Sequence, residues 1–375
     1  MSATAHSITG SLAGATFRFQ TDAADLVAYA TGHLAPLAAG AVSAPAVSAT
    51  LAWHDRQPPI EHSFERGLGA GIERVDRDVY TDGTTLHWFR VDDLRDLFLR
   101  FTWEDGRLDV HGDFYYRLGN SPLSDRIRRL RRWSQRAALR RRRFTTLLYY
   151  LVYYPCWWWL EHMRDVHPIH AAAVTTDAGA ILLAGASGVG KSTLAVALAM
   201  SPGARLLSDS FVLHKGDDVW AVREPILLDA WSRRWLGNAA EQLQSIDGSF
   251  GLKRRGYQLP STRLSDGGRA ALLLFPRRTS EPLVRRISSE QAHHRLSAAD
   301  LIINDLRRYW AFAAVLEQLQ LGGLAARREA HLARLVADVT CYDIGLTADM
   351  TSAAAVKAIM SLMQEQPLRV AGARQ

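Results

Sequence analysis

The nine residues GASGVGKST at positions 185–193 constrain the fold of this chain more than any other feature. They continue an apolar segment typical of a strand (AILLAG, 180–185) and lead into one typical of a helix (KSTLAVALAM, 191–200). Glycines let backbone N–H groups turn inward around phosphates, and a helix N-terminus adds partial positive charge. The pattern G-x-x-x-x-G-K-[ST] in this context predicts a P-loop that binds a nucleoside triphosphate.

Each residue type in the loop has a chemical role. Lys191 is expected to place a cation on the β- and γ-phosphates, and the Ser192 hydroxyl is expected to bind Mg²⁺. The alternative is a degenerate loop that keeps its shape without binding. The residues expected to contact the nucleotide are Gly185, Ala186, Ser187, Gly188, Val189, Gly190, Lys191, Ser192 and Thr193.

Asp209 ends the next apolar segment (ARLLSD), eighteen residues after Lys191. This spacing leaves room only for the loop, one short helix and one strand, so the carboxylate should lie beside the loop. There it could bind Mg²⁺, directly or through water, or take a proton from an attacking hydroxyl. The alternative role is the cap of a helix or turn.

His170 precedes the loop in the segment HPIHAAAV, fifteen residues before Gly185. A histidine that opens a strand is more often structural than functional. His167 nearby raises the question of a metal site, but no thiol is close and the pattern H-E-x-x-H is absent. The sequence therefore does not predict a metal site at these two histidines.

Taken together, His170, the loop and Asp209 resemble the HPr kinase/phosphorylase family and its relatives, bacterial serine kinases with a phosphoenolpyruvate-carboxykinase-like nucleotide fold. The resemblance covers about residues 167–230, extends in general layout to about 360, and does not include the first 120 residues. Asp209 in LLSDS matches the first of two acids, which the family uses as the catalytic base. Ser210 replaces the second acid, and the family's later glycine-rich segment around a metal-binding glutamate is not found. Glu224, in VREPILL, is the candidate in its place.

The resemblance implies an α/β fold of the HPr kinase type and an ATP-dependent kinase that transfers the γ-phosphate to a hydroxyl, most simply a serine of a protein or peptide. ATP and Mg²⁺ would be the cofactors, although the residues do not separate ATP from GTP. Asp209, Lys191 and His170 would be catalytic, and Ser192, Asp209 and Glu224 would hold the metal. The missing second acid argues against phosphorylase activity and against HPr as the substrate. It favours an alternative, a regulatory nucleotide-binding module without phosphotransfer.

The first 120 residues are rich in segments typical of strands, including ATFRFQ, SATLAWH, TTLHWFRV, DLFLRFTW and RLDVHGDFYY. Asp82-Gly83 and Asp105-Gly106 separate such segments, as expected for tight turns. Gly67, Gly69 and Gly71 superficially suggest a dinucleotide-binding fingerprint, but no apolar helix follows them. We therefore expect a β-rich N-terminal domain over residues 1–120.

Residues 121–160 differ from the segments on either side. Arg126–Arg143 contains ten arginines and no acidic residue. The formal net charge of the chain is +7, so without these ten arginines the acidic residues would outnumber the basic ones. Residues 144–160 carry no charge and include Pro155. A buried helix joining two domains fits best; a membrane-crossing helix and a peripheral membrane contact through 126–160 are the alternatives. Because the basic charge is local, no nucleic-acid partner is expected.

Three predicted regions follow: the β-rich domain at 1–120, an arginine-rich and aromatic helical junction at 121–160, and the P-loop α/β domain at 161–375. The two cysteines, Cys156 and Cys341, exclude a disulfide scaffold and a four-cysteine zinc site. No signal peptide is visible, so a cytoplasmic location is expected, with membrane association as the alternative. The family forms ring-shaped hexamers, which makes a homo-oligomer a candidate assembly.

Overall fold

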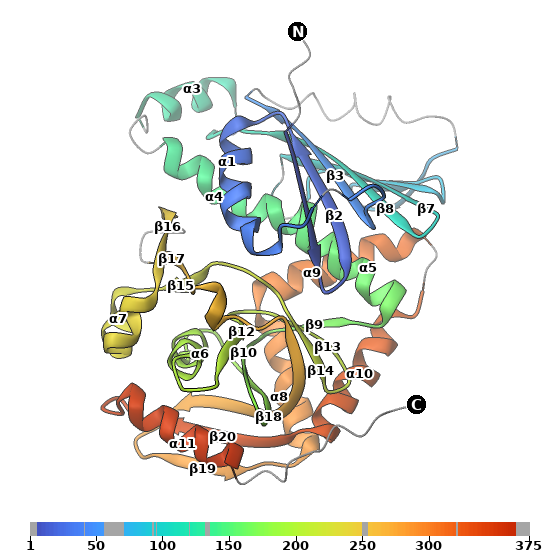
Figure 1. The fold of residues 1–375 in the computed structure, drawn as a ribbon. Coiled ribbons are helices and arrows are strands. Elements are labelled where there is room, and N and C mark those ends of the chain that lie inside the picture. The colour runs from blue at the N-terminus through green and yellow to red at the C-terminus, as the bar shows by residue number, and fades with distance from the viewer. Residues whose placement is uncertain are drawn as a thin grey trace. The chain divides into compact units, whose positions relative to one another are not determined.

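The computed structural model describes residues 6–40, 42–55, 71–91, 94, 96–119, 121–131, 136–249, 254–319 and 322–364. It forms a mixed α/β fold with two compact units (Figure 1). The first unit comprises Met1–Arg164 with Tyr309–Leu324, and the second comprises Asp165–Arg308 with Ala325–Gln375. Residues 309–324, expected within the C-terminal domain, therefore belong with the N-terminal unit. The arginine-rich and aromatic segment also belongs to the first unit.

The first unit is built on an eight-stranded sheet in the order β1-β2-β3-β8-β7-β6-β5-β4. The pairs β2–β3 and β3–β8 are parallel, and the other pairs are antiparallel. Alternating side chains of β2 are buried, as the two-residue periodicity predicts. The strands are β1 (His6–Leu12), β2 (Ala15–Thr21), β3 (Val47–His54), β4 (Glu73–Asp76), β5 (Val79–Thr81), β6 (Thr85–Trp88), β7 (Leu97–Glu104) and β8 (Arg107–Tyr115).

The turn between β7 and β8 confirms the prediction at Asp105-Gly106. Both residues have positive φ, 50° and 72°, as a two-residue hairpin turn requires. Gly83 has a φ of 90° in the turn before β6. Gly67 and Gly69, considered above for a dinucleotide fingerprint, lie outside the described residues.

The helices of the first unit include α1 (Ala24–Leu34), η1 (Ala35–Leu37), α3 (Pro122–Arg131), α4 (Arg136–Leu148), a π-helical turn η3 (Tyr149–Tyr153) and α5 (Tyr154–Arg164). Within η3 the chain makes a wide turn, in which the Tyr154 N–H donates to the Tyr149 carbonyl. Pro155 follows at once. Proline has no N–H to donate and crowds the preceding turn, and such an irregularity commonly accommodates it.

The aromatic segment 144–160 is buried in the first unit, as predicted. Trp157, Trp158 and Tyr150 are 0% exposed, and η3 and α5 pack on strands β2, β3 and β8. These rings are therefore covered by the fold, and a peripheral membrane contact through 126–160 stays a prediction. Among the residues described, no helix is both long enough and apolar enough to cross a membrane.

The second unit is built on a nine-stranded mixed sheet. Its main path is β12-β10-β11-β18-β14-β13-β9, and β20 pairs with both β18 and β19. The pairs β11–β18 and β18–β20 are parallel. The strands are β9 (His167–Ile169), β10 (Ala171–Thr176), β11 (Gly179–Ala184), β12 (Arg205–Ser208), β13 (Val212–Lys215), β14 (Asp218–Ala221), β18 (Gly267–Arg278), β19 (Leu283–Arg286) and β20 (Thr340–Leu346).

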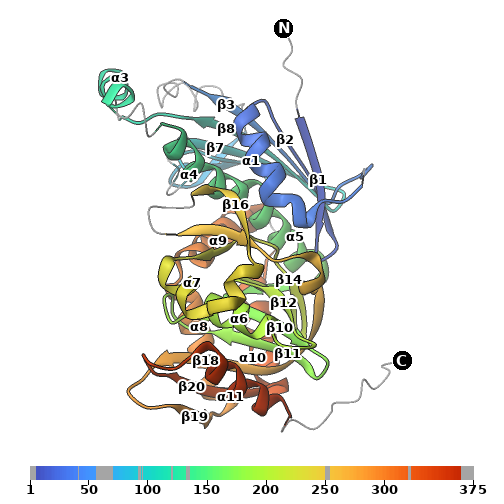
Figure 2. The same cartoon turned by 60° about the vertical axis from the view of Figure 1, so that its left-hand side comes forward.

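Helices cover both faces of this sheet (Figure 2). Val174 and Ile181 belong to a core formed with α6 and α11. Ala173 and Leu182, one residue away in each strand, belong to a second core formed with α8 and α10. The four helices are α6 (Lys191–Ala199), α8 (Ser289–Ile302), α10 (Leu324–Asp338) and α11 (Ser352–Gln364).

A small three-stranded sheet in the order β15-β17-β16 completes the second unit. Its strands are β15 (Ile226–Leu228), β16 (Gln244–Ser249) and β17 (Arg255–Gln258), accompanied by α7 (Ala230–Leu236), η4 (Gly237–Gln242) and η5 (Ser261–Arg263). The region expected to be helical, 288–320, begins with a capping box at Ser288 and Gln291. It is divided into α8, α9 (Asn304–Leu316) and η6 (Glu317–Leu319), because Ile303 is extended between the first two.

Candidate functional site

The glycine-rich loop has the predicted context, because it joins strand β11 to helix α6. Gly185, Gly188 and Gly190 have φ values of 120°, 85° and 99°, which other residues rarely adopt. A Cβ atom added to Gly188 or Gly190 would meet no other atom within 4 Å. The space over these two residues is therefore open, and it is the backbone conformation that requires glycine there.

Lys191 is the first residue of α6 and is only 6% exposed. Its Nζ donates to the Gly185 carbonyl at 2.7 Å and to the Ala186 carbonyl at 2.9 Å. Burial lowers the pKa of Lys191 to about 8, while the charge of Asp209 acts in the opposite direction. The ammonium group is thus held at the start of the loop by backbone oxygens.

Asp209 directly follows β12, as predicted, and is 4% exposed. Its Oδ2 accepts a long hydrogen bond from the Ser210 hydroxyl at 3.5 Å, and its Oδ1 is buried with no hydrogen-bond partner in the described part of the chain. Burial raises the pKa of Asp209; the Ser192 hydroxyl, the Leu227 N–H and the charge of Lys191 oppose this shift. The fold therefore brings Lys191, Ser192 and Asp209 together, with one carboxylate oxygen available.

His170 lies between β9 and β10 and is 9% exposed. Its ring packs edge-on against Phe211, with 5.2 Å between the centroids. Burial, followed by the charge of Lys191, lowers the pKa of His170 to about 3, so the ring is neutral at pH 7. The Nδ1 atom is buried with no hydrogen-bond partner among the described residues.

Asp300 is a buried residue of this region that sequence reasoning missed. It comes from α8, and its Oδ1 accepts a hydrogen bond from the His170 backbone N–H at 3.2 Å. Burial raises the pKa of Asp300 to about 7, although that hydrogen bond acts the other way. No local signal marks Asp300, because its partner lies 130 residues away in the sequence.

Glu224 lies in the connection between β14 and β15, where it is half-buried. The described residues contain one group of three His, Cys, Asp or Glu side chains close enough to share a metal ion. That group includes neither Asp209 nor Glu224. Of the three predicted magnesium ligands, Ser192 and Asp209 are neighbours, and metal binding by all three stays a prediction.

A small pocket next to the loop was also missed. It is lined in part by Val189, Gly190, Trp231, Trp235 and Arg278. The two indole rings are stacked, with centroids 6.4 Å apart and planes 18° from parallel, and Trp231 is 41% exposed. The Arg278 guanidinium lies 4.8 Å from the centroid of a Trp231 ring. The spacing of the tryptophans in AWSRRWL, one helical turn apart, is the sequence signal that could have found this pocket.

Thr193, expected to contact the nucleotide, lies against helix α7, and its contact with a nucleotide stays a prediction. Its hydroxyl donates to the Ser232 hydroxyl at 3.0 Å, and the residue is buried. The same pocket includes Thr193 in its lining. Thr193 therefore links α6 to α7, the helix that carries the two tryptophans.

Neither a family model nor a curated protein sequence matches the chain. Solved structures that match include the HPr(Ser) kinase/phosphatase from Coxiella burnetii, at 12% sequence identity and a TM-score of 0.24. The match covers 53% of this chain and 99% of that one. These values indicate a distant relation at most.

Proposed function

We propose that this protein is an ATP-dependent kinase that transfers the γ-phosphate to a hydroxyl, most simply a serine of a protein or peptide. One observation carries the proposal. A buried carboxylate, Asp209, has an oxygen with no hydrogen-bond partner in the described chain, and it lies beside the loop lysine and the loop serine. A buried carboxyl oxygen without a hydrogen-bond partner is costly, so such an arrangement is typical of a functional site.

The loop supplies charge and position. On binding, Lys191 would exchange the carbonyls of Gly185 and Ala186 for the β- and γ-phosphate oxygens, while the loop amides hold the phosphates. Mg²⁺, when bound, would neutralise the charge that develops on the phosphoryl group. Ser192 and Asp209 fit this ion by their oxygen donors and by the free Oδ1, and Glu224 would be the third protein ligand.

Asp209 would also orient or deprotonate the acceptor hydroxyl. A carboxyl whose pKa is raised by burial is a stronger base than an ordinary aspartate. His170 is neutral, and its buried Nδ1 can exchange a hydrogen bond with the acceptor, so we assign it to positioning rather than to charge neutralisation. Phosphoryl transfer depends mainly on positioning and electrostatics, and these residues supply both.

Trp231, beside the loop, offers a stacking surface for the nucleobase. Its indole is exposed, and the Arg278 guanidinium that lies over the ring would have to move aside for a planar base. The pocket itself is too small to enclose a base. We therefore propose that the base stacks on Trp231 while the phosphates lie over Gly188 and Gly190.

The test is transfer of labelled γ-phosphate from ATP-Mg²⁺ to protein and peptide mixtures. Lys191→Ala should lose both ATP binding and transfer, whereas Asp209→Asn should bind ATP and fail to transfer it. Lys357→Ala and Asp218→Asn change exposed residues of the same unit and serve as matched controls. Transfer that persists in both site variants would exclude this function.

A second candidate is a regulatory module that binds nucleotide without phosphotransfer. The observation that favours it is Ser210, which donates its hydroxyl to Asp209 where the HPr kinase family has a second acid. In that case the wild-type protein binds ATP, Lys191→Ala does not, and no acceptor in any mixture is labelled.

A further inference from the structure

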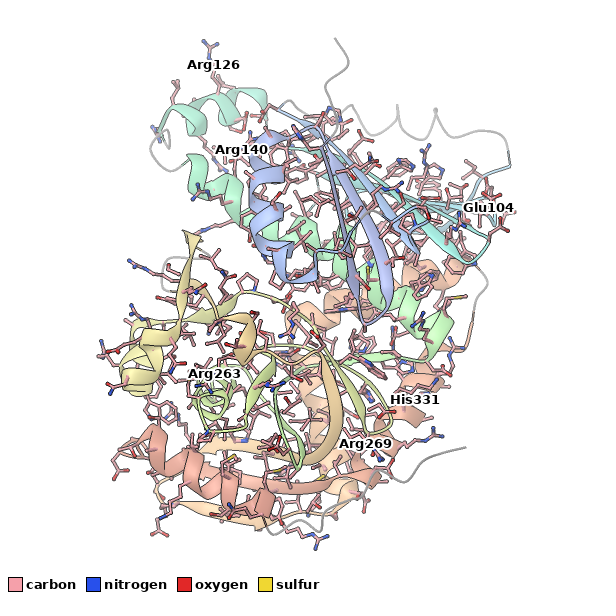
Figure 3. All side chains as sticks on the ribbon, viewed as in Figure 1. Glu104, Arg126, Arg140, Arg263, Arg269 and His331 are labelled. Carbon is pink, nitrogen blue, oxygen red and sulfur yellow. The ribbon has the colours of Figure 1, made fainter. Side chains whose placement is uncertain are left out.

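A cluster of two histidines and one aspartate lies in the second unit, formed by residues that the proposed kinase function does not use. Asp165, His167 and His331 each offer one ligand atom, and these atoms lie within 4.8 Å of one another. Asp165 and His167 lie at the start of β9, and His331 comes from α10, where Figure 3 labels it. The sequence could not show this cluster, because His331 joins it from 164 positions beyond His167.

The backbone fixes the first two residues of the cluster. Asp165 has a φ of 55°, a left-handed conformation that aspartate tolerates better than most residues. His167 is 1% exposed and pairs with His214 in the β9–β13 ladder. The His167 and His331 rings lie 4.5 Å apart between centroids, at an angle of 34°. Two imidazoles are thus held side by side next to a carboxylate.

The distances suit a small divalent metal. The His331 Nε2 atom is 4.0 Å from the Asp165 Oδ1 atom. Two ligands at about 2.1 Å from a tetrahedral zinc ion are roughly 3.4 Å apart. The three ligand atoms lie within 4.8 Å of one another, so side-chain shifts of up to about 1.4 Å would close the site. Two imidazole nitrogens and one carboxylate oxygen form a common zinc ligand set, with the fourth position left to water or another ligand.

The His331 Nδ1 atom is buried with no hydrogen-bond partner among the described residues.

The simpler explanation of the cluster is an ion-pair network. The Arg327 Nε atom is 3.6 Å from Asp165 Oδ1, so a cation already contacts the carboxylate. An isolated pair of this kind would account for Asp165. His331 also lies 4.0 Å from Asp165, but ion pairs to Asp165 do not by themselves explain why the His167 ring is held 4.5 Å from the His331 ring.

We propose that Asp165, His167 and His331 form a binding site for a divalent transition metal such as Zn²⁺. The site is independent of the P-loop and of the proposed phosphotransfer.

The test is metal binding by the tag-free full-length protein. Zn²⁺ is titrated in competition with a chromophoric chelator, and Co²⁺ is used to record the visible absorption that reports a tetrahedral site. Wild type should bind one Zn²⁺ and show the Co²⁺ bands. His331→Ala and Asp165→Asn should each weaken binding by roughly 100-fold or more, because even loss of an outer-shell partner costs 10–100-fold.

His294→Ala is the matched control, because this histidine lies in the same unit with a side chain that is 75% exposed. It should bind like wild type. Asp165→Asn is nearly isosteric, and circular dichroism verifies that each variant is folded. Absence of Zn²⁺ binding in the wild type, or equal binding by wild type and folded Asp165→Asn, would overturn the proposal.

Discussion

Three titratable side chains are buried beside the glycine-rich loop: Lys191, Asp209 and His170. Burial lowers the pKa of Lys191 and of His170 and raises that of Asp209, and in each case this favours the uncharged form. The charges of Lys191 and Asp209 oppose part of that shift in one another, since Asp209 raises the pKa of Lys191 and Lys191 lowers that of Asp209. The charge of Lys191 lowers the pKa of His170 further. Exclusion of water lowers the effective dielectric constant of the site and so strengthens the electrostatic interaction of its charged groups with a phosphoryl group.

Asp300 makes a testable prediction about the pH dependence of stability. Its pKa is raised from 3.8 to about 7 in the folded state, so between these values the folded protein holds more protons than the unfolded one. The wild type therefore loses stability relative to Asp300→Asn as the pH rises from about 4 to about 7. At 1.36 kcal/mol per pKa unit the relative change is up to about 4 kcal/mol. Urea unfolding at several pH values measures it, with Asp218→Asn as the control; a difference independent of pH would show that Asp300 is already ionised at pH 4.

Trp231 makes a prediction about nucleotide affinity. Trp231→Ala should weaken ATP binding by about 1–3 kcal/mol, the typical contribution of base stacking on an aromatic ring. Trp231→Phe should keep most of the affinity, because it keeps a ring. Equilibrium binding of labelled ATP separates the three proteins. Equal affinity of all three would mean that the base lies elsewhere.

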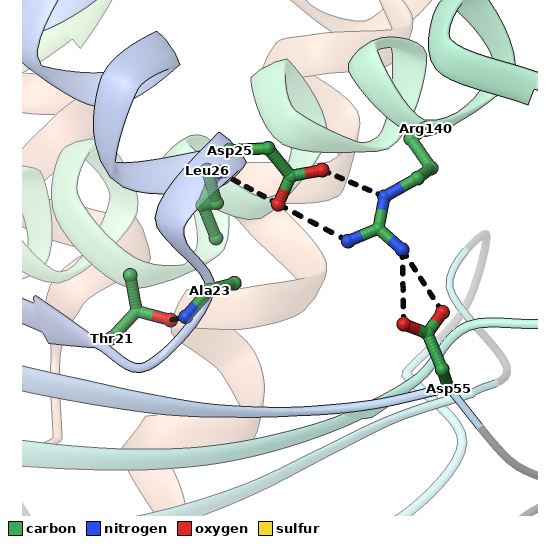
Figure 4. A network of polar contacts seen from close by, with 6 residues as sticks. All are labelled: Thr21, Ala23, Asp25, Leu26, Asp55 and Arg140. Carbon is green, nitrogen blue, oxygen red and sulfur yellow. Dashed lines mark hydrogen bonds and ion pairs between the residues drawn. The ribbon is translucent and has the colours of Figure 1, made fainter. Parts of the chain in front are cut away.

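At the scale of elements, one arginine of the basic segment anchors helix α4. Figure 4 shows Arg140 bridging Asp25 of α1 and Asp55, which follows β3. Its guanidinium also lies 4.4 Å from the centroid of a Trp53 ring, and its side chain is 15% exposed. Arg140 is therefore largely covered by its partners, whereas the neighbouring Arg141, Arg142 and Arg143 are exposed.

Replacing Arg140 tests this anchor. Arg140→Ala should lower the free energy of unfolding by about 2 kcal/mol, since it removes charge-assisted hydrogen bonds and a cation–π contact that is only partly screened by water. Arg142→Ala should change it by less than about 0.5 kcal/mol, as is usual for an exposed position. Denaturant unfolding measures both, and equal midpoints would refute the anchoring role.

Helix α3 is the part of the arginine-rich segment that could make a peripheral contact with a membrane. Leu123, Ile127 and Leu130 are 70%, 42% and 71% exposed at helical spacing, and Arg126 points away from the helix in Figure 3. We propose that α3 binds an anionic membrane surface, since exposed apolar side chains flanked by arginines match that chemistry.

Vesicle co-sedimentation tests the α3 proposal. Binding to phosphatidylglycerol vesicles should exceed binding to phosphatidylcholine vesicles, should fall at high salt, and should weaken about 10-fold or more in Leu123→Ser/Leu130→Ser. Sedimentation that depends on neither lipid charge nor salt would contradict it.

At the scale of the whole molecule, local sequence patterns predicted most strands, the P-loop context and the position of Asp209, because each depends on neighbours in the chain. Features that depend on distant partners escaped prediction. His331 reaches Asp165 only through the packing of α10, and Asp300 meets His170 only through α8. The assignment of residues 309–324 to the first unit also depends on distant partners. Tyr309 donates a hydrogen bond to Glu161, and no local sequence pattern indicates this long-range contact.

In the proposed kinase site, a triphosphate bound over the loop presents its γ-phosphate to Asp209. A crystal structure with a non-hydrolysable ATP analogue and Mg²⁺ tests this placement directly. We predict that Lys191 Nζ leaves the Gly185 and Ala186 carbonyls for the phosphates, that the γ-phosphate lies between Lys191 and Asp209, and that the base stacks on Trp231. A nucleotide bound away from the loop, or a γ-phosphate facing away from Asp209, would contradict it.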